Sequence, residues 1–296
     1  MQDLEHRYAN INGIRLHYVC AGDPTAPLML FVHGFPEFWM AWEGQLAEFA
    51  RTHFVVAPDL RGFNLSDKPP LVADYHPRKV VEDLRQLIQY LGRKRAIVVA
   101  HDWGGAVCWN LAAWHPEAIE RLVIINAPHP MTYARELSHN PAQQAASSYV
   151  LLFLQDKAER VMSDNNYARL LGMLDGWLKS AKPPSTETIA AYREAWAQPG
   201  AMTASLNYYR VSPLHPPSAA SPGAAKLNLS AEMFTVRVPT LVIWGEQDPA
   251  LLVGLLDGLE QYVPDLRIER IAEGTHFVAH ECPERVNGLI RDFLES

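Results

Sequence analysis

An aspartate stands where the chain is expected to turn sharply from a strand into a helix and expose a nucleophile. The segment AHDWGG (residues 100–105) follows a short apolar run and has the form small–x–nucleophile–x–Gly. Small residues suit this turn because it is tight and because the helix packs closely against the strand. The central residue is Asp102, and no G-x-S-x-G occurs elsewhere in the chain. The pattern therefore predicts a carboxylate nucleophile instead of a serine.

The aspartate changes the chemistry that this turn can perform. A carboxylate with an ordinary pKa of ~3.9 is already ionised near neutral pH, and the N-terminus of the following helix favours its charge. Such a group suits displacement at an sp3 carbon, which gives an alkyl-enzyme ester that water can then attack. The structural alternative is that Asp102 only caps the following helix, as aspartate does well.

Two further residues complete a set with the aspartate. Asp248 lies in the loop WGEQDP (residues 244–249) and His276 in the loop GTHF (residues 274–277), each after a predicted strand. The order nucleophile, acid, histidine along the chain is typical of proteins in which the nucleophile lies on this type of turn. His276 would activate water against the ester, and Asp248 would hold its tautomer and stabilise the imidazolium. Each is weak evidence alone, but together they predict a triad of Asp102, Asp248 and His276.

A metal site is the competing interpretation of the residues near His276. His280, Glu281 and Cys282 follow it closely and are of metal-ligating types. A helix is predicted to begin at Pro283, because proline is tolerated in a first turn, which leaves these residues in a turn. We therefore expect neither a metal nor a cofactor.

The segment HGFPE (residues 33–37) follows another predicted strand. Here the backbone amide of Phe35, together with that of Trp103, is expected to form an oxyanion hole. An ordinary strand-to-helix turn opened by Pro36 is the simpler interpretation, and the two are compatible. Because proline makes a cis bond accessible, we predict that the Phe35–Pro36 peptide is cis.

Short apolar runs alternate with helix-type stretches over most of the chain. Continuous apolar strands separated by helices indicate a mostly parallel sheet with helices on both faces, an α/β fold. The predicted strands are His6–Asn12, Ile14–Ala21, Leu28–Val32, Phe54–Ala57, Ala96–Ala100, Leu122–Asn126, Thr240–Trp244 and Leu266–Ile271, eight in all, with a tight turn at Asn12–Gly13. The predicted helices are Phe38–Arg51, Pro77–Leu91, Gly105–His115, Ala250–Tyr262 and one that begins at Pro283.

The alternation stops after the sixth strand. The next hundred or so residues show helical periodicity, many aromatics and no convincing buried strand, and Ser212–Ala225 is rich in Pro, Ser and Ala and is predicted to be a loop. We therefore predict a helical cap at residues 129–238, inserted into a core formed by residues 1–128 and 239–296.

Composition excludes several classes of function. The 296 residues carry a formal net charge of -7, and an acidic protein of this kind is an unfavourable partner for nucleic acid. The longest apolar runs fall short of the ~20 residues that span a bilayer, so no membrane association is expected. The start of the chain is polar, without an apolar leader. Three distant cysteines form no disulfide framework, which favours a cytoplasmic location.

Taken together, these motifs resemble the epoxide hydrolases of the α/β-hydrolase superfamily. HGFPE at 33–37, HDWGG at 101–105, the acid loop at Asp248 and GTHF at 274–277 carry the resemblance, which runs over nearly the whole chain. Asn64 stands where many relatives have glycine, but asparagine tolerates the left-handed conformation of such a turn. The resemblance implies the α/β-hydrolase fold, a small apolar epoxide and water as substrates and no cofactor, and it leaves a homodimer open.

The resemblance also implies two cap tyrosines that donate hydrogen bonds to the epoxide oxygen. The matching segments point to Tyr149 and, in the pair Tyr208–Tyr209, favour Tyr209. Adjacent helical residues point about 100° apart, so one member of the pair is expected to face Asp102 while the other packs. The alternative is that these tyrosines are only aromatic residues of the cap core.

Two other functions share parts of this pattern. A haloalkane or haloacid dehalogenase uses the same Asp-His-acid chemistry, but relatives of that type carry Asn where Phe35 stands or Arg where Trp103 stands. A non-catalytic, ligand-binding relative would show a decayed triad, whereas this one is complete. Epoxide hydrolysis is therefore the leading prediction, with dehalogenation as the alternative. The preferred epoxide and its stereochemistry stay open.

Overall fold

A computed structural model describes residues 4–296, which contain one eight-stranded sheet in the order β1-β2-β4-β3-β5-β6-β7-β8. Only the pairs β1–β2 and β2–β4 are antiparallel, which confirms the mostly parallel sheet. The strands are β1 (Glu5–Ile11), β2 (Ile14–Ala21), β3 (Leu28–Val32), β4 (Phe54–Pro58), β5 (Ala96–His101), β6 (Ile119–Ile125), β7 (Thr240–Gly245) and β8 (Leu266–Ile271).

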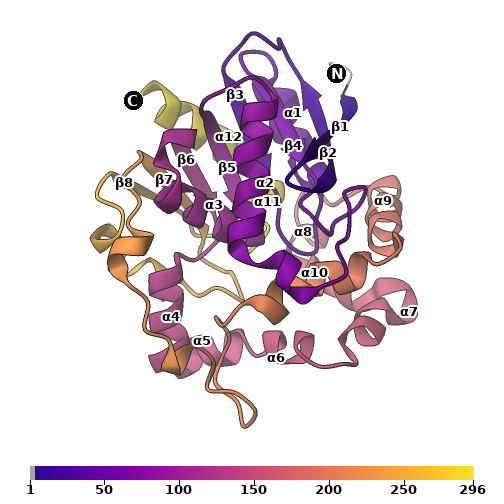
Figure 1. Cartoon of the computed structure of the whole chain (residues 1–296), viewed down its shortest axis with the longest axis vertical. Helices are drawn as coiled ribbons and strands as arrows, with labels where there is room; N and C mark the ends of the chain where they lie inside the picture. Colours follow the sequence, from indigo (N-terminus) through magenta and orange to yellow (C-terminus); the bar gives the residue numbers. More distant parts are fainter. Residues whose placement is uncertain (1–3) are drawn as a thin grey trace.

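The central strands are buried because helices cover both faces of the sheet. Every residue of β3, β4, β5 and β7 is buried, as the continuous apolar runs predict. Helices α2 (Pro77–Tyr90) and α3 (Asp102–Trp114) lie on one face, and α1 (Glu43–Phe49) and α12 (Pro283–Glu295) lie on the other (Figure 1). The fold class is therefore confirmed.

The segment between β6 and β7 lies at one end of the sheet (Figure 1). Residues 126–239, all of which the structure describes, contain helices and loops and no strand. The division into a cap at residues 129–238 and a core stays our prediction. The α-helices of this segment are α4 (Pro130–His139), α5 (Pro141–Ala146), α6 (Tyr149–Phe153), α7 (Ala158–Met173, interrupted at residues 164–167), α8 (Asp175–Leu178), α9 (Thr186–Ala197) and α10 (Ala201–Val211).

Several predictions of local structure were wrong. The predicted helix Phe38–Arg51 is a 3-10 helix at Trp39–Trp42 followed by α1, and β6 begins at Ile119 instead of Leu122. No helix spans residues 250–262; the chain forms two short 3-10 helices there, Val253–Leu256 and Leu259–Gln261. Gly258, with φ of +75°, separates them, since a left-handed residue ends helical geometry. Helix α3 begins at Asp102, three residues before the predicted start.

Turn chemistry was predicted more accurately. Asn12 and Gly13 both have positive φ, as a type I′ hairpin turn between β1 and β2 requires. Asn64 adopts a φ of +39°, so it takes the left-handed conformation that glycine would otherwise supply. Residues 212–222 form the predicted loop, which ends in a 3-10 helix at Gly223–Lys226.

Three other observations concern the described residues as a set. No helix within residues 4–296 is long and apolar enough to cross a membrane. The same residues contain no group of three or more His, Cys, Asp or Glu side chains arranged to hold a metal ion. Cys20, Cys108 and Cys282 are free thiols.

Candidate active site

The turn between β5 and α3 presents Asp102 in a conformation that few non-glycine residues adopt. Its φ is +50°, and it is the first residue of α3, directly after the last residue of β5. The neighbouring glycines leave no room for a side chain. A Cβ on Gly34 would lie 2.3 Å from Asp102 Oδ1, and one on Gly105 would lie 2.2 Å from Ala127 Cβ. These close approaches explain why the turn needs small residues.

The three residues predicted as a triad meet at the carboxyl ends of β5, β7 and β8. His276 Nδ1 lies 2.6 Å from Asp248 Oδ2, and His276 Nε2 lies 3.5 Å from Asp102 Oδ2. Asp248 is buried, and the side chains of Asp102 and His276 are only 13% and 12% exposed. The histidine therefore bridges the two carboxylates, with one ring nitrogen toward each.

Asp248 is held rigidly by four hydrogen bonds. Its Oδ1 accepts from the backbone amides of Ala250 and Leu251 at 2.8 and 2.9 Å. Its Oδ2 accepts from His276 and, at 2.8 Å, from Asn126 Nδ2. Asn126 Oδ1 in turn accepts from the amide of Gly245. Sequence analysis missed Asn126, whose position just after β6 was the only available indication.

The charges of this triad are strongly coupled. Burial by itself lowers the pKa of His276, but the nearby carboxylates of Asp248 and Asp102 overcome it and raise that pKa well above its ordinary value. Burial would likewise raise the pKa of Asp102, yet His276 and the Phe35 amide hold it below the ordinary range. The two carboxylates therefore favour the charged form of the imidazole that lies between them.

The loop after β3 supplies a backbone donor to the nucleophile. The amide of Phe35 donates to Asp102 Oδ1 at 2.7 Å, and the Phe35–Pro36 peptide is cis, as predicted. The amide of Trp103 belongs to the first turn of α3, where N–H groups have no partner within the helix. Both amides predicted for an oxyanion hole thus flank Asp102.

The tyrosines suggested by the resemblance come from two helices of the segment between β6 and β7. Tyr149 begins α6, Tyr209 lies in α10, and both line the same cavities as Asp102. The adjacent Tyr208 points elsewhere, because its hydroxyl donates to the carbonyl of Arg61 at 3.0 Å. Burial raises the pKa of Tyr149 and Tyr209 well above the ordinary value, so both phenols stay protonated donors.

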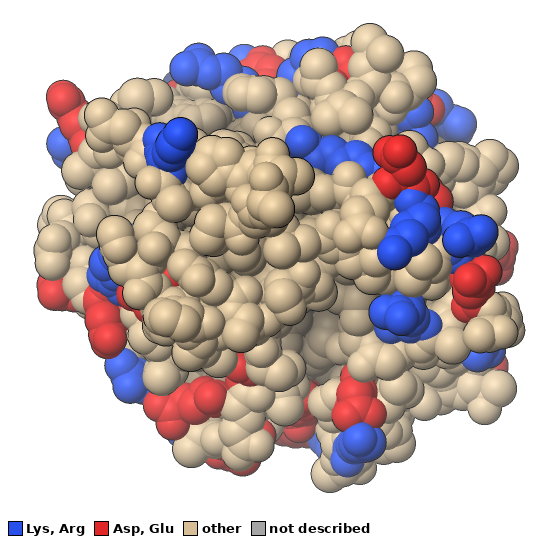
Figure 2. All heavy atoms as spheres, turned by 90° about the horizontal axis from the view of Figure 1, so that it is seen from below, with Lys and Arg blue, Asp and Glu red and all other residues tan. Residues whose placement is uncertain are grey.

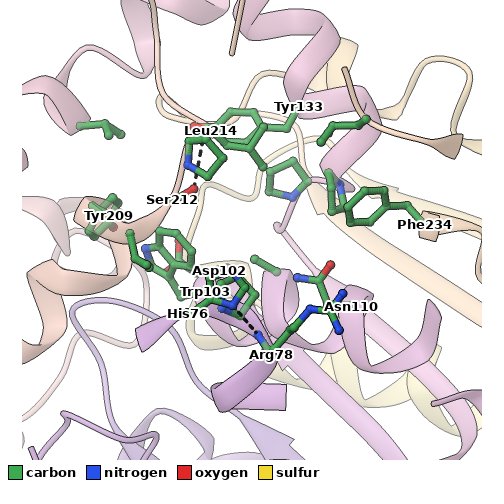
Figure 3. A pocket seen from close by; sticks show the side chains of 18 of the residues that line it. His76, Arg78, Asp102, Trp103, Asn110, Tyr133, Tyr209, Ser212, Leu214 and Phe234 are labelled. Carbon is green, nitrogen blue, oxygen red and sulfur yellow. Dashed lines mark hydrogen bonds between the residues drawn. The ribbon is translucent and has the colours of Figure 1, made fainter. Parts of the chain in front are cut away.

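Two cavities meet at Asp102, Tyr149 and Tyr209. One has a volume of about 310 Å³ and extends toward Trp114 and Phe234; the other has about 580 Å³ and extends past His276 toward Met173. Figure 3 shows Asp102, Trp103 and Tyr209 in the first cavity, opposite Tyr133. The face of the molecule seen in Figure 2 is hollowed, and its surface is largely uncharged. Apolar sites of this size suit small organic ligands.

A buried carboxylate beneath the site was also missed. Glu37, the last residue of HGFPE, lies 2.7 Å from His280 Nε2 and 3.2 Å from His101 Nδ1, and accepts from Tyr192 of α9 at 3.0 Å. Burial opposes its ionisation, but His280 and His101 hold the pKa of Glu37 far below its ordinary range. The other ring nitrogen of His101 lies 2.9 Å from the carbonyl of His276. Through His101, Glu37 thus connects the loop after β3 to the backbone of His276.

A third tyrosine also lines the first cavity. Tyr133 of α4 lies there with its hydroxyl 3.2 Å from Ser147 Oγ, and burial raises its pKa to about 12. Nothing in the spacing of the cap residues singled it out.

Comparisons with known proteins agree with this arrangement. Residues 27–283 match the family model described as alpha/beta hydrolase fold. The chain is 36% identical to the AB hydrolase superfamily protein YfhM of Bacillus subtilis, with all of both chains covered. It is 37% identical to epoxide hydrolase 3 of Xenopus tropicalis, over 98% of this chain and 78% of that protein.

A solved structure has the same fold as this chain. An epoxide hydrolase from Bacillus megaterium superposes with a TM-score of 0.90 and 36% identity, over 98% of this chain and 100% of that one. The triad geometry, the sheet order and these relatives show that the chain belongs to the α/β-hydrolase fold family and groups within it with the epoxide hydrolases.

Proposed function

We propose that this protein hydrolyses apolar epoxides to vicinal diols through a covalent ester on Asp102. One observation carries the proposal: two protonated tyrosines, Tyr149 and Tyr209, line both cavities that contain the carboxylate. An epoxide oxygen leaves as an alkoxide that stays tethered to the substrate, so it needs donors while its charge develops. Several relatives named epoxide hydrolase, at 33–37% identity, support the same substrate class.

In the first step, Asp102 Oδ2 attacks an epoxide carbon and the carbon–oxygen bond of the ring breaks. Oδ1 is the oxygen that accepts from the Phe35 amide, so we assign the attack to Oδ2, which lies 3.5 Å from His276 Nε2. The electron pair of the broken bond goes to the ring oxygen, which takes a proton from a tyrosine hydroxyl. The product is an alkyl-enzyme ester with its carbonyl oxygen at the Phe35 and Trp103 amides.

In the second step, His276 takes a proton from a water molecule, and the resulting hydroxide attacks the ester carbonyl. The Phe35 and Trp103 amides stabilise the oxyanion that forms. Asp248 stabilises the imidazolium through its 2.6 Å contact with His276 Nδ1. Collapse of the intermediate breaks the bond between the acyl carbon and the substrate oxygen, which takes the proton of the Asp102 carboxyl group, so the diol is released and the carboxylate is restored. The imidazolium proton of His276 then returns through water to the tyrosinate left by the first step.

The proposal is tested by offering the purified protein a styrene-type epoxide, a matched bromoalkane and a nitrophenyl ester. We expect diol from the epoxide and much slower release of bromide or nitrophenol. Bromide release without diol formation would favour a dehalogenase, which shares the triad but holds a halide instead of an oxygen.

Asn126→Ala is expected to slow the second step. The substitution removes one of four hydrogen bonds that orient Asp248, and a hydrogen bond to a charged group contributes ~1.5–3 kcal/mol. Hydrolysis of the ester should slow by about tenfold, while alkylation, in which Asp248 takes no direct part, should change little. Single-turnover kinetics separate the two rates. An equal fall in both rates would mean that Asn126 supports the fold and not the orientation of Asp248.

A further inference from the structure

The loop that carries Asp248 forms no helix or strand, so its shape depends on other bonds. We call residues 246–252, directly after β7, the Asp248 loop. The backbone amides of Ala250 and Leu251 donate to Asp248 Oδ1 at 2.8 and 2.9 Å. The orientation of the Asp248 carboxylate and the path of the residues that follow it therefore depend on each other.

Gln143 of α5 binds the Asp248 loop from outside. Its Oε1 accepts from the Leu252 amide at 2.9 Å, and its Nε2 donates to the Ala250 carbonyl at 2.8 Å. Nε2 also donates to Ser147 Oγ at 2.8 Å. Exchange of oxygen and nitrogen in this amide would set donor against donor and acceptor against acceptor, so only one orientation fits. The Gln143 side chain is fully buried, and a bond lost there is not replaced by bulk water.

The start of α5 leaves the Gln143 side chain available to the loop. Asn140 caps this helix by accepting from the amides of Ala142 and Gln143. In a capping box, a glutamine at this position bonds back to the backbone amide of the capping residue. Here the Asn140 amide donates instead to the Glu136 carbonyl at 2.9 Å. The helix therefore does not need the Gln143 side chain for its own cap.

Ala250 connects Gln143 to the triad. Its N–H donates to Asp248 and its carbonyl accepts from Gln143. Asp248 Oδ2 in turn lies 2.6 Å from His276 Nδ1. Asn126 holds the same carboxylate from the end of β6. Asp248 is thus oriented from two sides, by the sheet through Asn126 and by α5 through Gln143.

We propose that Gln143 is a positioning residue for hydrolysis of the ester, because it holds the Asp248 loop in the shape that aligns Asp248 with His276. The carboxylate stabilises the imidazolium only while it meets the ring at hydrogen-bond distance and angle, and such groups must be held within about 0.5 Å. The segment between β6 and β7 thereby acts on the second step through Gln143, as it acts on the first through Tyr149 and Tyr209. This inference rests on the proposed function.

A purely structural role for Gln143 would have a different signature. Tyr149 begins α6, six residues after Gln143, so a general displacement of α5 would move this tyrosine and slow alkylation. Loss of the alignment between Asp248 and His276 would slow hydrolysis of the ester and leave alkylation unchanged. The ratio of the two rate constants therefore distinguishes positioning of the triad from attachment of the helix.

The test follows a single turnover of a styrene-type epoxide by Gln143→Met. Methionine has nearly the length of glutamine, but it has no donor and accepts only weakly. Rapid quenching and intact-protein mass spectrometry give the rate constants for formation and decay of the ester, and neither depends on the fraction of folded protein. We expect decay to slow by about fivefold and formation to stay within about twofold of the wild type.

Leu252→Pro removes one of the same hydrogen bonds from the side of the loop. Leu252 has a φ of -72°, which proline adopts, and proline has no N–H to donate to Gln143. This variant keeps the test decisive if Gln143→Met does not fold. It should slow decay of the ester by about threefold with little change in its formation.

Gln144→Met is the matched control. Gln144 is the neighbouring glutamine of α5, and its Nε2 donates to the Leu137 carbonyl. Within residues 4–296, no hydrogen bond joins its side chain to the Asp248 loop. Both rate constants should therefore stay at their wild-type values.

A double variant shows whether Gln143 acts through Asp248. If it does, adding Gln143→Met to Asp248→Ala should not slow decay of the ester any further. Further slowing would show that Gln143 acts by another route. Equal slowing of both steps in Gln143→Met would reduce the residue to an attachment of α5, and unchanged rates would remove its role altogether. These results would leave epoxide hydrolysis intact, whereas a wild-type protein that forms neither ester nor diol would reject the proposed function itself.

Discussion

His276→Gln is expected to convert the protein into a trap for its own intermediate. Glutamine cannot accept a proton from water, so the ester on Asp102 should form normally and then persist, with hydrolysis slowed by ~10²–10⁴-fold. Intact-protein mass spectrometry after mixing with excess epoxide should show one added substrate mass. Peptide mapping should place that mass on the peptide containing Asp102.

Asp102→Asn is the control for this experiment. It removes the nucleophile while keeping the shape of the side chain, so turnover should fall by ~10⁴-fold or more and no adduct should form. In the wild type, a single turnover in labelled water should leave the label on Asp102 and not in the diol. Label found only in the diol, with no adduct on the His276 variant, would mean that water attacks the epoxide directly.

The pH dependence of the same step gives an independent check. His276 must be neutral to accept a proton, so ester hydrolysis should speed up as the pH rises through the pKa of His276. Both Asp248 and Asp102 raise that pKa in the free protein. Because esterification removes the charge of Asp102, the midpoint for hydrolysis should lie below the one found by titrating His276 in the free protein. A midpoint at or above the latter value would contradict this account.

Replacing both tyrosines by phenylalanine should nearly abolish alkylation by epoxides. Tyr149→Phe and Tyr209→Phe each remove one donor to the developing alkoxide, and we expect each to slow alkylation by ~10–10³-fold. The ester should not accumulate in the double variant, because its hydrolysis depends on His276. Pre-steady-state measurement of alkylation, beside activity on a matched bromoalkane, provides the readout.

Tyr208→Phe is the matched control for these variants. Its hydroxyl donates to the Arg61 carbonyl, so the substitution should lower stability by ~1 kcal/mol and leave alkylation close to the wild-type rate. If the variants at Tyr149 and Tyr209 alkylate as fast as the wild type and release bromide efficiently, the protein is a dehalogenase.

The amino-acid sequence was sufficient to determine the sheet and the approximate position of the site. The strands at Leu28–Val32 and Leu266–Ile271 were predicted to the residue. The first is a continuous apolar run that fits a strand covered on both faces. The small residues around Asp102 were equally informative, because only such residues fit where backbones approach within van der Waals distance. Patterns of this kind depend on neighbours in the chain.

Local patterns failed where a tertiary contact or a single residue outweighed them. The leucine-rich stretch Ala250–Tyr262 has helical periodicity, but the left-handed Gly258 interrupts it, and the chain forms two short 3-10 segments instead. The family resemblance favoured Tyr209 over Tyr208 without deciding between them. The carbonyl of Arg61, far away in the chain, binds the hydroxyl of Tyr208 and leaves Tyr209 to the cavity.

The partners of the triad were decided by the tertiary structure alone. Asn126 meets Asp248 across 122 residues of chain, and Glu37 meets His280 across 243. Glu37 belongs to the HGFPE motif and Asn126 follows β6, but nothing in the sequence indicates which residue either of them contacts. A buried carboxylate or amide takes whichever donor or acceptor the packed elements bring within about 3 Å, and that depends on how strands and helices stack.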